Sequence, residues 1–203
     1  MRIGIDIDGV LTDVGRFVID YMTKYCVDNN IEYNITGSNY EYYKAFNISE
    51  KQEDDFWEGY LEYYAVNAIA RPFAAEVIKK LRTDGHEIYI VTARWLTNRD
   101  DAAGERMRET VRAWLAKNNI SYDKLIFTKA TGERKHQEIL ANRISLIIED
   151  NPRNIQELAE IIPVICYHSE YNQDCSGNNI IRCYSWYDIY HKLSEISGGT
   201  DRN

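Results

Sequence analysis

Two carboxylates near the N-terminus, Asp6 and Asp8, are the residues of this sequence best suited to chemistry. They end a short β-branched run from Ile3 to Ile7 that is typical of a strand, and Gly9 follows directly. Two acids at a strand end repel each other unless a cation lies between them, and Mg²⁺ prefers such hard oxygen ligands. The alternative is that Asp8 and Gly9 only form a turn and that Asp6 is solvated. The pair predicts a metal site if the rest of the chain supplies partners.

Two further strands place polar residues where these partners would be needed. From residue 70 onward the pattern alternates between helix and strand, which favours a mainly parallel sheet with right-handed crossovers. Thr92 follows a strand expected over 87–91, and Asp150 follows a strand expected over 144–148. Because ligands bind at the carboxyl ends of parallel strands, we expect these residues to converge on Asp6 and Asp8.

This part of the chain divides into five expected helices and five expected strands. We expect helices over 73–81, 100–118, 133–141, 153–161 and 186–196, and strands over 87–91, 125–128, 144–148, 164–167 and 180–183.

The segment between the first strand and residue 70 has a different character. It holds about half of the aromatic residues of the chain, and apolar residues at helical spacing predict helices over 14–28 and from Ser49 onward. We expect a small helical lobe here, inserted between two strands of the sheet. Most of its aromatic residues would form the core of the lobe, while some would line a substrate pocket; the candidates are Phe17, Tyr43, Phe46, Trp57 and Tyr64.

Composition limits the class of partner. The chain has 203 residues and a formal net charge of −8, which argues against a nucleic-acid polymer but leaves room for a small phosphorylated substrate. No apolar run approaches the ~18 to 20 residues that cross a bilayer, and the N-terminus lacks a signal-peptide pattern, so we expect no membrane partner. The four cysteines lack CxxC spacing, which predicts free thiols and a cytoplasmic location.

Two stretches resemble motifs of the haloacid dehalogenase (HAD) superfamily of phosphotransferases. The run Asp-Ile-Asp-Gly-Val-Leu-Thr-Asp from Asp6 is similar to the first motif of the superfamily, and Ile-Val-Thr-Ala-Arg, which contains Thr92, is similar to the second. The resemblance implies a Rossmann-like α/β fold, with a core over 1–13 and 70–203 and a helical cap over 14–69.

The later motifs of the superfamily match with one departure and one ambiguity. Ile-Ile-Glu-Asp-Asn-Pro-Arg-Asn, through Asp150, is similar to the acidic fourth motif, but Glu149 stands where many relatives have aspartate. Lys135, fourteen residues before Glu149, matches the expected lysine, and Lys129 is its rival.

The resemblance also implies a Mg²⁺-dependent phosphomonoester hydrolase. In that chemistry Asp6 attacks phosphorus and forms an aspartyl-phosphate, while Asp8 exchanges protons with the leaving group and water. Thr92 and Lys135 would bind the phosphoryl oxygens. The metal would be held by Asp6, by Asp8 through its backbone carbonyl, and by Asp150.

Several of these residues also have simpler interpretations. Gly9 and Arg94 are candidates for substrate binding, but Arg94 could equally pair with a surface acid. Thr92 could cap the next turn, and Lys135 could be a solvated helix residue. Asn154 and Asp13 are candidate partners of the site residues, and the four histidines are expected at the surface.

Within the superfamily the chain most resembles 5′(3′)-deoxyribonucleotidases and related bacterial nucleotidases, which favours a nucleoside monophosphate as substrate. The features that carry this are the cap size and the residues Arg71, Pro72, Phe73, Tyr171, Asn172, Ser185 and Trp186. A sugar phosphate or another small phosphometabolite is the alternative, as is a non-catalytic protein on the same fold. A nucleotide-sugar transferase is disfavoured because only five residues precede Asp6. The aromatic residues suggest either a homodimer or a closing cap.

Overall fold

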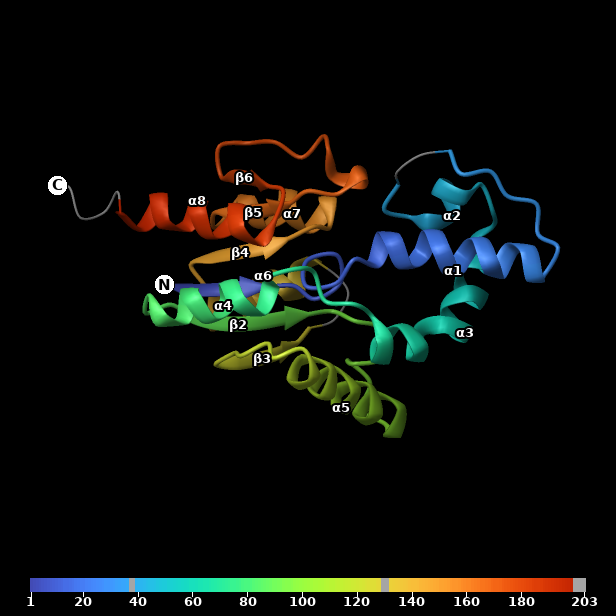
Figure 1. Ribbon diagram of the computed structural model, residues 1–203, viewed down its shortest axis with the longest axis horizontal. Coiled ribbons are helices and arrows are strands. Elements are labelled where there is room, and N and C mark those ends of the chain that lie inside the picture. Colours follow the sequence, from blue (N-terminus) through green and yellow to red (C-terminus); the bar gives the residue numbers. More distant parts are fainter. Residues whose placement is uncertain (37–38, 129–131, 199–203) are drawn as a thin grey trace.

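A six-stranded, fully parallel sheet organises the computed structural model, which describes residues 1–36, 39–128 and 132–198 (Figure 1). The strand order is β3-β2-β1-β4-β5-β6, so the order reverses between β1 and β4. The strands are β1 Arg2–Ile5, β2 Glu87–Thr92, β3 Lys124–Phe127, β4 Leu146–Glu149, β5 Val164–Tyr167 and β6 Ile180–Cys183. Such a reversal opens a crevice at the carboxyl ends of the two strands, which is where ligands bind in this class of fold.

Helices cover both faces of the sheet because successive side chains of each strand point to opposite faces. Ile88 and Ile90 of β2 belong to one hydrophobic cluster, together with residues of α4, α5 and α8. Tyr89 and Val91 belong to a second cluster, together with residues of α6 and α7. These helices are α4 Ala74–Thr83, α5 Ala102–Lys117, α6 Gly132–Ala141, α7 Pro152–Ala159 and α8 Trp186–Gly198. The Rossmann-like α/β fold is therefore confirmed.

Residues 14–69, which we call the insert, form helices beyond the carboxyl ends of the strands (Figure 1). The helices are α1 Val14–Asp28, α2 Tyr42–Phe46 and α3 Glu50–Asn67. They share a hydrophobic cluster of their own, built around Val18, Met22, Phe46 and Phe56. The insert leaves and rejoins the sheet at one point, where Thr12 and Ala70 form an antiparallel bridge.

The first strand is shorter than the β-branched run predicts. It ends at Ile5, and the chain turns at Gly9, which has a φ of +85°. Two short elements, α2 and the 3₁₀ turn Glu170–Asn172, are absent from the sequence-based expectations, because each is too short to show a period. No helix in the described part of the chain is long and apolar enough to cross a membrane.

Candidate active site

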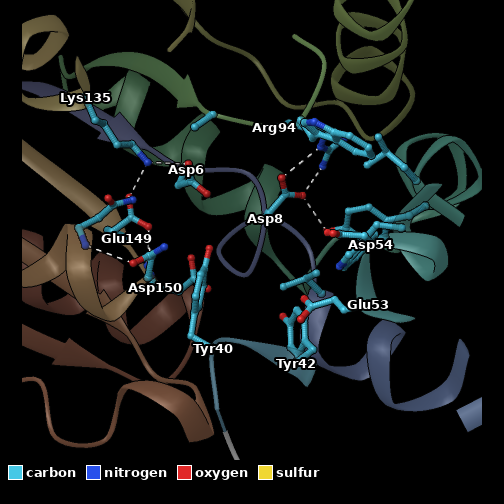
Figure 2. Close-up of a pocket in the computed structure, with 18 residues that line it drawn as sticks. Asp6, Asp8, Tyr40, Tyr42, Glu53, Asp54, Arg94, Lys135, Glu149 and Asp150 are labelled. Carbon is cyan, nitrogen blue, oxygen red and sulfur yellow. Dashed lines mark hydrogen bonds and ion pairs between the residues drawn. The ribbon is translucent and has the colours of Figure 1, made fainter. Parts of the chain in front are cut away.

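A cavity of about 450 Å³ lies where β1, β2 and β4 end beneath the insert (Figure 2). Its lining combines carboxylates, cations and aromatic rings. The charged residues are Asp6, Asp8, Glu53, Asp54, Arg94, Lys135, Glu149 and Asp150, and the aromatic ones are Tyr40, Tyr42, Trp57, Tyr64 and Trp95. Residues from distant parts of the sequence therefore meet at the point that the fold assigns to a ligand.

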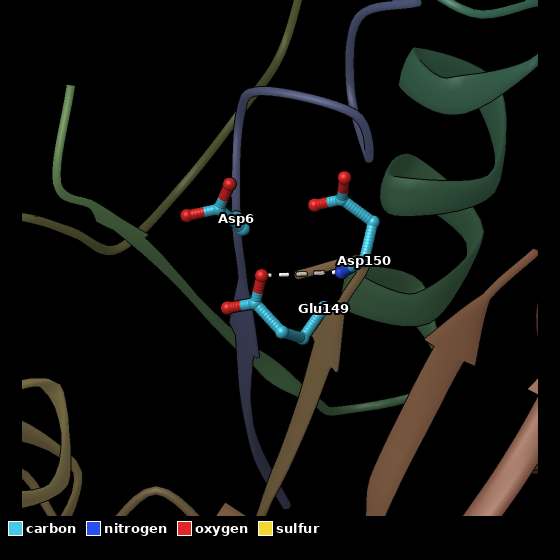
Figure 3. A group of neighbouring side chains, drawn as sticks. All are labelled: Asp6, Glu149 and Asp150. Atoms are coloured by element: carbon cyan, nitrogen blue, oxygen red, sulfur yellow. Dashed lines mark hydrogen bonds between the residues drawn. The ribbon is translucent and has the colours of Figure 1, made fainter. Parts of the chain in front are cut away.

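Three carboxylates, those of Asp6, Glu149 and Asp150, face a common space at the base of this cavity (Figure 3). Each offers an oxygen within 4.8 Å of the others, and all three residues are buried. Asp6 is fixed by its backbone N–H, which donates to the Ile148 carbonyl at 3.1 Å and extends the pairing of β1 with β4. The cluster therefore joins the ends of the two strands between which the strand order reverses.

Glu149 and Asp150 reach the same space although they are consecutive in sequence. The longer side chain of Glu149 folds back, and its Oε1 accepts the N–H groups of Asp150 and Asn151, both at 3.1 Å. Asp150 is braced from the loop after β5: the Tyr171 hydroxyl donates to Oδ2, and Asn172 Nδ2 donates to the Asp150 carbonyl at 2.8 Å.

Lys135 supplies the positive charge of the cluster from α6. Its Nζ donates to Asp6 Oδ1 at 2.7 Å and to Glu149 Oε2, and its side chain is 3% exposed. Burial lowers the pKa of Lys135, but the two carboxylates outweigh this and the pKa is raised overall. Lys135 is therefore a charged residue of the cluster and not a solvated helix residue. Its rival, Lys129, lies outside the described residues.

The cluster carries more negative than positive charge. Burial raises the pKa of Asp6 to about 7, and Lys135 opposes this shift. Burial, reinforced by Glu149 and Asp6, also raises the pKa of Asp150. Buried carboxylates at this spacing favour a cation between them, because one lysine cannot neutralise three acids. The donor set, all carboxylate oxygen, fits a divalent metal of the hard class.

The Asp8 carboxylate faces away from this cluster, toward Arg94 and the insert (Figure 2). Arg94 donates to it twice, through Nη2 and through Nε at 3.1 Å, and the Tyr64 hydroxyl donates to Oδ1 at 2.7 Å. Any metal contact of Asp8 is thus left to its backbone carbonyl. The interpretation of Arg94 as half of a surface ion pair is wrong, because its side chain is 2% exposed.

Thr92 and Gly9 are placed close to the site by their backbones. Thr92 is buried, and its hydroxyl accepts the N–H of Arg94 at 3.2 Å, as the turn-capping interpretation expects. Gly9 lies against Asp150 and accepts a hydrogen bond from Arg71 Nε at 3.2 Å through its carbonyl. Neither residue is among the described side chains that line the cavity, so their predicted contacts with substrate remain predictions.

The two candidate partners of the site residues, Asn154 and Asp13, lie in different places. Asn154 lines the cavity and donates to Glu149 Oε2 at 3.4 Å. Asp13 caps the start of α1, where it accepts the Arg16 N–H at 3.1 Å, and it also accepts a hydrogen bond at 3.2 Å from Nη1 of Arg71, which binds the Gly9 carbonyl.

Sequence reasoning missed how Tyr64, Tyr171 and Arg71 bind the site together. The sequence identifies Tyr64 only as an aromatic residue of the lobe, and Tyr171 and Arg71 only as features of the resemblance. Their hydrogen-bond partners were not predicted, because these contacts join residues that lie 21 to 62 positions apart in the sequence. The signal that was available is the dipeptide of Tyr171 and Asn172, which places a phenol and an amide in the loop that follows the strand expected over 164–167.

A sequence profile of the family described as 5′ nucleotidase, deoxy (pyrimidine), cytosolic type C protein matches residues 1–196. The chain belongs to this nucleotidase family. A nucleotidase of Clostridium acetobutylicum is 31% identical over 193 residues, which cover 94% of this chain and 92% of that protein. As a member of the nucleotidase family, the chain is a phosphomonoester hydrolase, and the family implies a small nucleotide phosphate as substrate.

Solved structures share the fold of this chain at low sequence identity. A HAD-superfamily hydrolase from Ehrlichia chaffeensis has a TM-score of 0.54 at 16% identity, with 96% of each chain covered. A D,D-heptose 1.7-bisphosphate phosphatase from B. bronchiseptica, complexed with magnesium and phosphate, has a TM-score of 0.56 at 12% identity, with 96% of this chain and 99% of that one covered. The expectation that this nucleotidase-family chain has a HAD fold is thus confirmed.

Proposed function

We propose that the protein is a Mg²⁺-dependent nucleotidase that releases phosphate from a nucleoside monophosphate through an aspartyl-phosphate on Asp6. One observation carries the proposal: Asp6 is held by Lys135 inside a buried cluster of three carboxylates at the base of a cavity. A carboxylate in this position combines a nucleophilic oxygen with an adjacent cation that offsets the charge of a phosphate.

Asp6, Glu149 and Asp150 would hold the metal, and the Asp8 carbonyl is its fourth candidate ligand. When bound, Mg²⁺ neutralises charge on the phosphoryl oxygens and on the carboxylates. Two observations support the fit: the oxygens of the three side chains lie within 4.8 Å of one another, and their burial leaves a charge that Lys135 alone does not balance.

The proposed reaction divides between the two aspartates. The Asp6 carboxylate oxygen bonds to phosphorus as the ester oxygen leaves, and Asp8 gives that oxygen its proton. Water then loses a proton to Asp8 and attacks phosphorus, which breaks the acyl-phosphate bond and restores Asp6. The separation of the two side chains, one facing Lys135 and the other facing Arg94, supports this division of roles.

Arg94 and Lys135 are the groups proposed to receive the phosphoryl oxygens. Arg94 Nη1 is buried and has no hydrogen-bond partner within the described part of the chain, so an incoming oxygen could satisfy it. Thr92 is proposed to act through the backbone turn that its hydroxyl stabilises.

The wall of the cavity that the insert provides supports a nucleoside as the leaving group. We infer that residues 14–69 act as the cap of a core formed by residues 1–13 and 70–203. Among its described lining residues this wall has rings and the acids Glu53 and Asp54, but no lysine or arginine. A second phosphate, as on a sugar bisphosphate, would be repelled by these carboxylates. The base and sugar of a nucleoside would instead offer a ring that can stack and donors that can bond to the acids.

A cytoplasmic location accords with the four cysteines, which are all free. A homodimer remains a prediction, supported by exposed rings such as Phe73 and Tyr184.

The proposal is tested by phosphate release from deoxyribo- and ribonucleoside monophosphates, ribose 5-phosphate, a sugar bisphosphate and p-nitrophenyl phosphate. Each assay is run with Mg²⁺, with EDTA, and with Asp6→Asn, whose folding is checked by circular dichroism. We expect Mg²⁺-dependent turnover, highest for nucleotides and lost in Asp6→Asn. Turnover highest for ribose 5-phosphate or the bisphosphate would reject the nucleotide assignment, and full activity of Asp6→Asn would reject the mechanism.

A further inference from the structure

A hydroxyl from the insert touches the proposed proton-transfer residue of the core. Tyr64 lies in α3 and is 2% exposed, and its hydroxyl donates to Asp8 Oδ1 at 2.7 Å. The same hydroxyl oxygen lies 2.7 Å from Thr12 Oγ1, which is also 3.2 Å from the Ile7 carbonyl. Because the single phenolic proton goes to Asp8, the threonine is the donor in any bond with the tyrosine.

Asp8 is therefore fixed by three donors, two from Arg94 and one from Tyr64. The guanidinium carbon of Arg94 also lies 5.2 Å from the centroid of the Tyr64 ring. Rotation of the Asp8 carboxylate would break at least one of these bonds, two of which come from the buried guanidinium of Arg94. The side chain consequently has one preferred orientation, which depends on Tyr64 being in place.

The position of Tyr64 is set by contacts between the insert and the core. Leu61 and Ala65, on either side of Tyr64 in α3, pack with Met107 of α5. Just after α3, the Ala68 carbonyl accepts a hydrogen bond from Trp114 Nε1 at 2.7 Å. A shift of α3 away from α5 would withdraw the hydroxyl from Asp8.

We propose that Tyr64 is a positioning residue that orients Asp8 toward the leaving group and so makes protonation of that group depend on the docked insert. This inference rests on the proposed function, because it assumes that Asp8 is the proton donor. It assigns to the insert a part in the chemical step, in addition to any contact with the substrate.

Substrates with different leaving groups can distinguish the proposed role of Tyr64 from simple packing. An alkoxide, such as the 5′-oxygen of a nucleoside, leaves poorly without a proton, whereas p-nitrophenolate leaves readily without one. A residue that only packs would affect both substrates alike. A residue that positions the acid matters mainly for the alkoxide.

The test compares Tyr64→Phe, which keeps the ring, with the wild type on a nucleoside 5′-monophosphate and on p-nitrophenyl phosphate. We expect kcat for the nucleotide to fall by about tenfold or more, with KM little changed and kcat for the aryl ester within about twofold. Tyr63→Phe is the matched control: Tyr63 is 46% exposed, and among the described residues its hydroxyl bonds only to Tyr21. It should match the wild type on both substrates.

Equal losses on both substrates, or no loss on either, would overturn the inference while leaving the proposed function intact. A wild type that hydrolyses neither substrate would overturn the proposed function itself. If Tyr64→Phe does not fold, Thr12→Val decides, because it removes the other hydroxyl that holds Tyr64 and should give a smaller loss with the same selectivity for the nucleotide.

Discussion

The backbone of Gly9 lies directly against the carboxylate of Asp150. A Cβ on residue 9 would be 1.9 Å from Asp150 Oδ2, and its φ of +85° is a conformation that side chains disfavour. The glycine therefore lets the turn after β1 approach the end of β4 closely enough to complete the acidic cluster.

Gly9→Ala should displace Asp150 and weaken divalent-cation binding by about 10- to 100-fold. Calorimetric titration with Mg²⁺ measures this change. Gly59→Ala is the control: Gly59 lies in α3, and a Cβ added to it would meet no described atom within 4 Å, so cation binding should be unchanged and stability should rise by about 0.5–1 kcal/mol. Unchanged affinity in Gly9→Ala would refute the role given to this contact.

Lys135→Met should lower the free energy of unfolding by about 3 kcal/mol in EDTA, because it leaves two buried carboxylates without a counter-charge. Urea denaturation measures the loss. Lys51→Met, which removes an 81% exposed partner of Asp55, should change stability by less than about 1 kcal/mol. If the two variants prove equally stable, the buried pair does not hold the cluster together.

Cation binding should weaken as the pH falls below 7. The pKa of Asp6 is raised to about 7 by burial, so below this pH the metal must displace a proton. For each proton that the metal displaces, its affinity should fall by about tenfold per pH unit below 7. Titrations in buffers of different ionisation enthalpy count the protons released, and a flat affinity between pH 6 and 8 would contradict the prediction.

The thiols of Cys166 and Cys183 should resist alkylation in the native protein. Both are buried, and burial raises the pKa of each to about 12, so little thiolate exists at pH 8. Iodoacetamide labelling followed by mass spectrometry should be slow in buffer and fast in urea. Rapid labelling of either cysteine without denaturant would show that this part of the sheet opens readily.

The architecture was predictable from the sequence because its elements follow strong local patterns. The helix expected over 14–28 and the strands expected over 164–167 and 180–183 have the predicted bounds. Convergence of Asp6 and Asp150 followed from the rule that parallel strands end at one edge.

The orientation of the site residues was less predictable, since it depends on contacts between remote segments. Asp6 and Asp8 look equivalent in the sequence, yet the early end of β1 and the turn at Gly9 send their side chains to different partners. The burial of Arg94 depends on the insert, whose Tyr64 covers it. No local pattern connects residues 8, 64 and 94.

The central position of β1 also determines the order in which the site can assemble during synthesis. Both of its neighbours, β2 and β4, are made later, so the strand that leads into Asp6 has no partner when it leaves the ribosome. At about 5–20 residues per second, Asp150 follows Asp6 by roughly seven to thirty seconds. A nascent chain stopped before β4 contains the nucleophile but only one of the three acids of the cluster. Such a truncated product could bind neither the cation nor the phosphate as the finished protein is proposed to do.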